Sequence, residues 1–199
     1  MKSIVRIFIL VFVLCGSVEF GLAQQLEKKV YKSNIHTVQL RKQGDSLAPP
    51  IIHLNSNEHV ILSFDELREE SNSYSYKLVH CNAQWEPSDL MEHEYLYSQF
   101  SSNIQFSKSS FNTIMSYTHY QEVIPNDRIE PSISGNYAVI VYAYNNPEDT
   151  VLVEHFHISE GKASVRASME AINRMSPGKP NQQLNFSVNS GSVYIQNPY

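Results

Sequence analysis

Hydrophobic and polar positions alternate in short runs along most of this chain, which is the pattern of half-buried β-strands. The clearest runs are residues 35–40, 51–54, 59–64, 73–81, 117–124, 137–144 and 150–158, and weaker ones are 95–100 and 104–111. Proline, asparagine, aspartate and glycine separate the runs roughly every 8–14 residues, a spacing that indicates an all-β sandwich or barrel. No long amphipathic helix is predicted between them, so the pattern favours an all-β protein over a parallel α/β sheet.

The run at 137–144 is apolar on both faces and therefore predicts a central strand. The Ser-Gly-Asn-Tyr turn at 134–137 is typical of the penultimate strand in immunoglobulin-like and fibronectin-like sandwiches. We therefore predict an immunoglobulin/fibronectin-like antiparallel β-sandwich over residues 24–160. A membrane β-barrel is the rival, but charges and prolines interrupt these strands too often for a lipid-facing surface.

The first 23 residues have the order of a secretory signal peptide. Lys2 and Arg6 precede an apolar run at 7–14, and small residues at 21 and 23 mark a cleavage site before Gln24. The apolar run is shorter than the roughly 20 residues that cross a bilayer. A retained anchor and a lipoprotein modified at Cys15 are the alternatives. We expect an exported protein.

Residues 161–199 predict a linker and the incomplete start of a second β-rich region. The segment 165–174 fits a strand or a helix, and the choice stays open. Residues 183–188 and 193–195 predict a hairpin around a turn at 189–192. Because an isolated hairpin buries too little surface to be stable, these strands either join the first sandwich or begin a second domain that the chain does not complete, and we expect the second.

Composition limits the classes of partner and chemistry. The formal net charge is −5 and there is no basic stripe, so nucleic acid is not an expected partner. Once the signal is removed, Cys81 is alone, which excludes an internal disulfide. We expect a buried, inert thiol, with a mixed disulfide to a partner as the alternative. His80 and Cys81 point to opposite faces of a strand, so they do not form a catalytic pair.

Motifs of catalysis and metal binding are weak. His155 and His157 would share one strand face, but no third ligand is identifiable. Ser159 and Lys162 fit a Ser-x-x-Lys spacing without its companion motifs, and no Gly-x-Ser-x-Gly turn occurs. We predict a protein that is not an enzyme, with no metal, no cofactor and no small-molecule substrate.

Trp85 is the one tryptophan of the chain and lies in a predicted loop. It fits a loop anchor packed on the sandwich, or an exposed interface residue, since tryptophan is enriched at interface hot spots. As partner-contact candidates we take two loops, represented by Trp85, Glu86 and Asp89 in the first and by Asn146 and Glu148 in the second.

Several separated segments resemble one family. Residues 80–90, 94–96, 117–120 and 131–137, with opening strands at 37–40 and 49–54 and a later segment at 183–199, resemble the N-terminal domain of the Plug family of the type IX secretion system. The resemblance implies export to the periplasm of Bacteroidota, where members bind the large outer-membrane translocon barrel and plug its periplasmic opening. It implies membrane contact only through that partner, a longer chain than this one, and no catalytic residues.

Two other functions remain open from the sequence. One is an exported immunoglobulin-like adhesion or carbohydrate-binding module, which would require a platform of exposed aromatic rings. The other is an accessory domain of an enzyme whose catalytic part lies beyond Tyr199.

Overall fold

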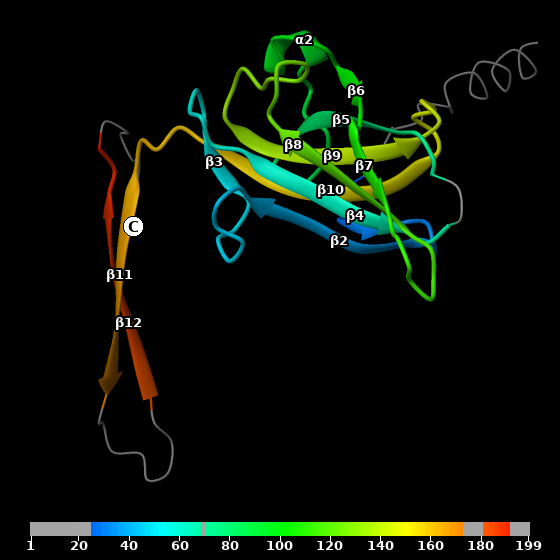
Figure 1. Cartoon of the computed structure of the whole chain (residues 1–199). Helices are drawn as coiled ribbons and strands as arrows, with labels where there is room; N and C mark the ends of the chain where they lie inside the picture. The colour runs from blue at the N-terminus through cyan, green and yellow to red at the C-terminus, as the bar shows by residue number, and fades with distance from the viewer. Residues whose placement is uncertain (1–24, 69–70, 173–180, 192–199) are drawn as a thin grey trace, which may run out of the picture.

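Two β-sheets face each other in the computed structural model, which describes residues 25–68, 71–172 and 181–191 (Figure 1). One sheet has the order β1-β10-β9-β5-β6, with β3 also pairing with β10; the other has the order β2-β4-β8-β7. The bounds of these strands are Lys29–Val30 (β1), Ile35–Lys42 (β2), Ile51–His53 (β3), Val60–Glu66 (β4), Tyr74–Cys81 (β5), Ser101–Asn103 (β6), Phe106–Ser109 (β7), Thr118–Ile124 (β8), Gly135–Ala143 (β9) and Thr150–Ser159 (β10). The predicted all-β antiparallel sandwich is confirmed.

Alternating side chains of the two sheets fill the space between them, as strand geometry requires. On β4 and β8, every second residue is buried, and β9 is buried along most of its length. Phe64 stacks on Tyr120 with ring centroids 5.1 Å apart, and Tyr74 meets Tyr120 edge-on at 4.9 Å. β9 lies between β10 and β5, which confirms its predicted central position.

Two features match immunoglobulin-like sandwiches. The short β3 leaves the β2–β4 side of the fold and pairs parallel with β10, so that Ile51 lies opposite His157. At the start of β9, the Tyr137 hydroxyl donates a hydrogen bond to the Ile133 carbonyl oxygen, 2.9 Å away. Such a tyrosine that bonds back to the preceding turn is a hallmark of the penultimate strand in this fold. The interpretation of the 134–137 turn is therefore supported.

Two local predictions need correction, and one short strand was not predicted. Residues 95–100 are not a strand: a single helical turn, Glu92–Tyr95 (α2), is followed by an isolated bridge at Leu96. The Met91 backbone N–H donates to the Glu94 carboxylate at 2.7 Å, which favours the helical turn over an extended chain. The expected strand at 104–111 is limited to β7, and Phe111 belongs to the loop after it. β1 has only two residues, too few to show a period.

Beyond the sandwich, β11 (Ser164–Ile172) and β12 (Asn181–Asn189) form a separate two-stranded ribbon (Figure 1). The open question at 165–174 is thus decided in favour of a strand for residues 165–172, the described part of that segment. The partner of β12 is β11, with Val165 opposite Val188 and Met169 opposite Leu184, so apolar side chains share one exposed face. The predicted partner strand at 193–195 and the predicted signal at 1–23 lie outside the described residues.

Among the described residues, no helix is long and apolar enough to cross a membrane.

Candidate interaction surface

The loop after β5 is held against the sandwich by its tryptophan. The Trp85 ring stacks on His155 of β10, with ring centroids 3.6 Å apart and planes 5° from parallel, and it lies 5.4 Å from His157. The Trp85 backbone has a φ of 62° and its carbonyl accepts a hydrogen bond from the Leu26 N–H at 2.8 Å. Burial lowers the pKa of His155, which favours the neutral ring in this stack. Trp85 is therefore a loop anchor.

The polar side chains of the same loop have different environments. Asn82 organises the turn, because its Oδ1 accepts from the Gln84 and Glu86 N–H groups at 2.8 and 3.0 Å. Its amide nitrogen donates to the Glu86 carboxylate at 2.8 Å. Asp89 is exposed. Of the three candidates here, Asp89 is the side chain that a partner could reach without disturbing the loop.

The second candidate loop connects β9 to β10 at the other end of the same sheet. Asn146 and Glu148 are exposed, and the Asn146 Oδ1 accepts from the Glu148 N–H at 3.2 Å. β5 and β9 are antiparallel, with Tyr74 opposite Ala143 and Cys81 close to the first loop. Seven residue steps along β5 therefore separate the two loops by roughly 24 Å. The structure does not bring the two sets of candidates together.

The N-terminal segment crosses the outer face of the β10–β9 sheet between these loops. The His155 ring nitrogen donates to the Leu26 carbonyl at 2.6 Å, and the Lys32 ammonium pairs with the Asp149 carboxylate at 2.6 Å. A hollow of about 380 Å³ lies beside this segment, with Ile140 and Val153 in its lining. Sequence patterns gave no sign of this segment, because it has too few residues in strand conformation to show a period.

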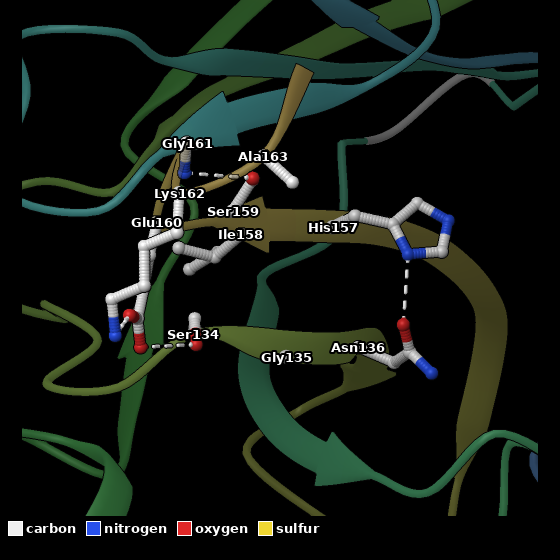
Figure 2. Close-up of a pocket in the computed structure, with 10 residues that line it drawn as sticks. All are labelled: Ser134, Gly135, Asn136, His157, Ile158, Ser159, Glu160, Gly161, Lys162 and Ala163. Atoms are coloured by element: carbon white, nitrogen blue, oxygen red, sulfur yellow. Dashed lines mark hydrogen bonds and ion pairs between the residues drawn. The ribbon is translucent and has the colours of Figure 1, made fainter. Parts of the chain in front are cut away.

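An open, shallow hollow of about 420 Å³ lies where the chain leaves β10 (Figure 2). Its polar side chains bind one another: the Ser134 hydroxyl donates to Glu160 at 2.9 Å, and Lys162 pairs with the same carboxylate. The Ser159 hydroxyl oxygen accepts from the Gly161 N–H at 3.1 Å. Lys162 is therefore paired with an acid, and the Ser-x-x-Lys spacing is not accompanied by a serine–lysine hydrogen bond among the contacts of the described residues.

The two histidines of β10, His155 and His157, each bond to a backbone or amide oxygen rather than lying among further metal-ligating side chains. His155 donates to a backbone carbonyl, as described above, and His157 Nδ1 lies 2.8 Å from the Asn136 Oδ1. In the part of the chain that the structure describes, no group of three or more histidine, cysteine, aspartate or glutamate side chains could hold a metal ion.

Cys81 provides a direct test of the inert-thiol interpretation. It is buried among Ala138, Ile140 and Val153, and burial raises its pKa to about 11. His80 lies on the opposite face of β5. Since only the thiolate attacks electrophiles, we expect no labelling of the native protein by iodoacetamide at pH 8 over minutes, and rapid labelling in urea. Mass spectrometry before and after unfolding checks this; fast native labelling would contradict it.

A third loop, which the sequence interpretation did not select, is far more apolar than the two candidates. It joins β7 to β8, and Phe111, Ile114 and Met115 within it are 94%, 110% and 61% exposed. The available signal was the cluster Phe-Asn-Thr-Ile-Met itself, which lacks the alternation of a strand. Phe111 ends the segment at 104–111 that predicts a strand, so the cluster has no separate signature in the sequence.

Comparison with known proteins places the sandwich in a family. Residues 35–160 match the family described as the type 9 secretion system plug protein 1st domain. No curated protein matches the chain. A hypothetical protein from Parabacteroides merdae ATCC 43184, solved as a crystal structure, is 28% identical with a TM-score of 0.80, over 88% of this chain and 44% of that one. This chain thus spans less than half the length of that protein.

A second solved structure is much less similar. It is the alkylpurine DNA glycosylase AlkC of Pseudomonas fluorescens, bound to DNA containing an abasic site analog. The identity is 12% and the TM-score 0.35, over 63% of this chain and 30% of that one, too low to indicate a shared fold.

Proposed function

Because the chain belongs to the type 9 secretion system plug protein family through residues 35–160, we propose that it is a non-enzymatic periplasmic subunit of that system. In this proposal it binds the outer-membrane translocon barrel and occupies its periplasmic opening until cargo arrives. The family match is the observation that carries the proposal. Residues 1–23 would act as the export signal and be removed.

The physical properties of the sandwich suit this mechanical role. A rigid sandwich can fill a wide pore by its shape. Release on cargo arrival requires modest affinity, which a partly polar interface of moderate size provides. Asp89, Asn146 and Glu148, the exposed polar candidates, fit such an interface.

The carbohydrate-binding alternative receives no support from the tryptophan. A sugar-binding platform needs an exposed aromatic face, whereas the Trp85 ring is half-buried and stacked on His155. Nothing in the geometry favours an adhesion module over a secretion subunit.

The opposite positions of the two candidate loops allow a sharp test. A pore mouth faces one end of the sandwich, so only one loop is expected to lie within crosslinking distance of the barrel. We would introduce a photoreactive amino acid at Asp89 in one variant and at Glu148 in another, in cells that contain the translocon. We expect a covalent adduct with the barrel from one position and much less from the other. Substitution of Trp85 is a poor probe, because it would also remove the loop anchor.

The same cells provide a control variant, and two outcomes in them would contradict the proposal. A third variant carries the photoreactive residue at Lys77, in the middle of β5, where a pore mouth at either end is out of reach. If the tagged protein co-purifies with the barrel but neither loop reacts, both loop assignments are wrong. If the barrel is absent from the purified material, the proposed function itself is wrong.

A further inference from the structure

The connection between β7 and β8 is the most exposed apolar segment of the sandwich. We call residues 110–117 the apolar loop. Phe111 and Ile114 are 94% and 110% exposed, and Met115 is 61% exposed. Figure 1 shows this connection extending beyond the ends of the neighbouring strands. Exposed apolar patches on soluble proteins commonly mark sites that contact a partner or a membrane. We therefore consider what apolar surface this projecting tip could contact.

The apolar loop is organised by its own hydrogen bonds. The Ser110 N–H donates to the Tyr117 carbonyl at 2.8 Å, and the Tyr117 N–H donates back to the Ser110 hydroxyl oxygen at 3.0 Å. The Thr113 hydroxyl lies 2.9 Å from the Met115 carbonyl oxygen, to which it donates. Backbone groups that are already bonded inside the loop need less water, and transfer of the tip out of water therefore costs less.

Charge on the hairpin is sparse and positive. Between positions 106 and 117 there is no acidic residue, and Lys108 is the one basic residue. The hollow at the base of the loop is lined by Asp65 and His119, whose carboxylate oxygen and ring nitrogen lie 2.6 Å apart. The hairpin itself therefore carries a net positive charge, which would attract rather than repel an anionic surface that the tip approaches.

The apolar area of the tip indicates whether a lipid surface or a protein is the better partner for it. A buried aromatic side chain supplies at most about 250 Å², so three apolar side chains, of which only Phe111 is aromatic, offer less than about 750 Å². A stable protein interface needs about 800 Å² from each partner and a surrounding rim. Insertion into a membrane interface has no such requirement, because an amphipathic segment buries its apolar face only about 5–10 Å into the boundary between headgroups and acyl chains.

We propose that, beyond the contact through a partner that the family resemblance implies, the apolar loop inserts into the surface of a phospholipid bilayer and gives the protein a direct, reversible membrane contact. The side chains of Phe111, Ile114 and Met115 would enter the acyl region, while Lys108 would remain at the headgroups. A contact of this size is weak alone, as a single acyl chain is. It is still strong enough to detect with vesicles in excess, and a second interaction that holds the protein beside the membrane would strengthen it.

Vesicle co-sedimentation tests the proposal without any protein partner. The probe is vesicles of phosphatidylethanolamine and phosphatidylglycerol, with the full chain as purified. We expect the double substitution Phe111→Ser with Ile114→Ser to weaken vesicle binding at least fivefold. The matched control Leu47→Ser removes another fully exposed apolar side chain, 96% exposed in the β2–β3 connection, and is expected to change binding less than twofold.

Fluorescence then locates the inserted residue. In a Phe111→Trp variant, brominated acyl chains should quench the new tryptophan, whereas Trp85 in the unsubstituted protein, stacked on His155, should be unaffected. Three results would overturn the proposal: no vesicle binding by the unsubstituted protein, equal binding by the double variant, or no quenching at position 111. Loss of translocon recovery in the double variant, with vesicle binding unchanged, would identify a protein pocket as the occupant instead.

Discussion

Replacing Gly135 by alanine is expected to lower the free energy of unfolding by about 3 kcal/mol. A Cβ at this position would lie 2.3 Å from the His80 Nε2, and the backbone φ is 150°, which L-residues rarely adopt. His80 cannot easily move away, since its ring packs against Tyr137 and Tyr95 at 5.3 and 5.8 Å and its Nδ1 lies 2.9 Å from the Ser88 hydroxyl. Urea unfolding followed by circular dichroism measures the loss.

Two further variants separate the steric clash from backbone strain. Gly44 also has a positive φ, 83°, but nothing lies within 4 Å of a Cβ built there, so Gly44→Ala should cost only about 1 kcal/mol. Combining Gly135→Ala with His80→Ala removes the obstructing ring and should recover part of the loss in a double-mutant cycle. Purely additive effects of the two substitutions would show that the ring is not the cause.

Strand positions were accessible from the sequence because half-buried strands leave a period of two. β4, β5 and β8 lie within two residues of their predicted bounds, since alternate positions along each strand face the core. The Ser-Gly-Asn-Tyr turn that ends at Tyr137 also indicated the strand that follows it. Strand order was not accessible, because pairing between segments as distant as β1 and β10 depends on packing rather than local pattern.

The predicted contact residues show a different limit. Trp85 was recognisable from the sequence as the one tryptophan, in a predicted loop. Whether it anchors the loop or contacts a partner depends on what its ring packs against. That residue, His155, is 70 positions away along the chain, so the local sequence could not reveal it. Nor could the sequence tell that Asp89 and Glu148 stand at opposite ends of the sheet. The apolar loop was missed because Phe111 was counted as the end of a strand, and exposure at a loop tip has no periodic signature.

The second large effect is expected at Glu66, which is fully buried at the end of β4. Its carboxylate accepts from the side-chain amides of Asn34 and Asn72 at 3.1 and 2.5 Å, and the Tyr120 hydroxyl lies 3.3 Å from its other oxygen. Burial raises the pKa of Tyr120 to about 12, so this hydroxyl keeps its proton at ordinary pH. One carboxylate thus joins the turn before β2, the segment after β4 and strand β8.

Glu66→Ala should therefore destabilise the sandwich by about 3–5 kcal/mol, because it opens a cavity and removes the acceptor from the half-buried amides of Asn34 and Asn72. Glu66→Gln retains one acceptor and most of the volume, so about 1–2 kcal/mol is expected. Glu148→Ala, at an exposed position, should stay within about 0.5 kcal/mol of the unsubstituted protein. Urea midpoints of the three variants give this order. Equal midpoints for Glu66→Ala and Glu148→Ala would mean that water replaces the carboxylate at no cost, and that the network does not tie the three segments together.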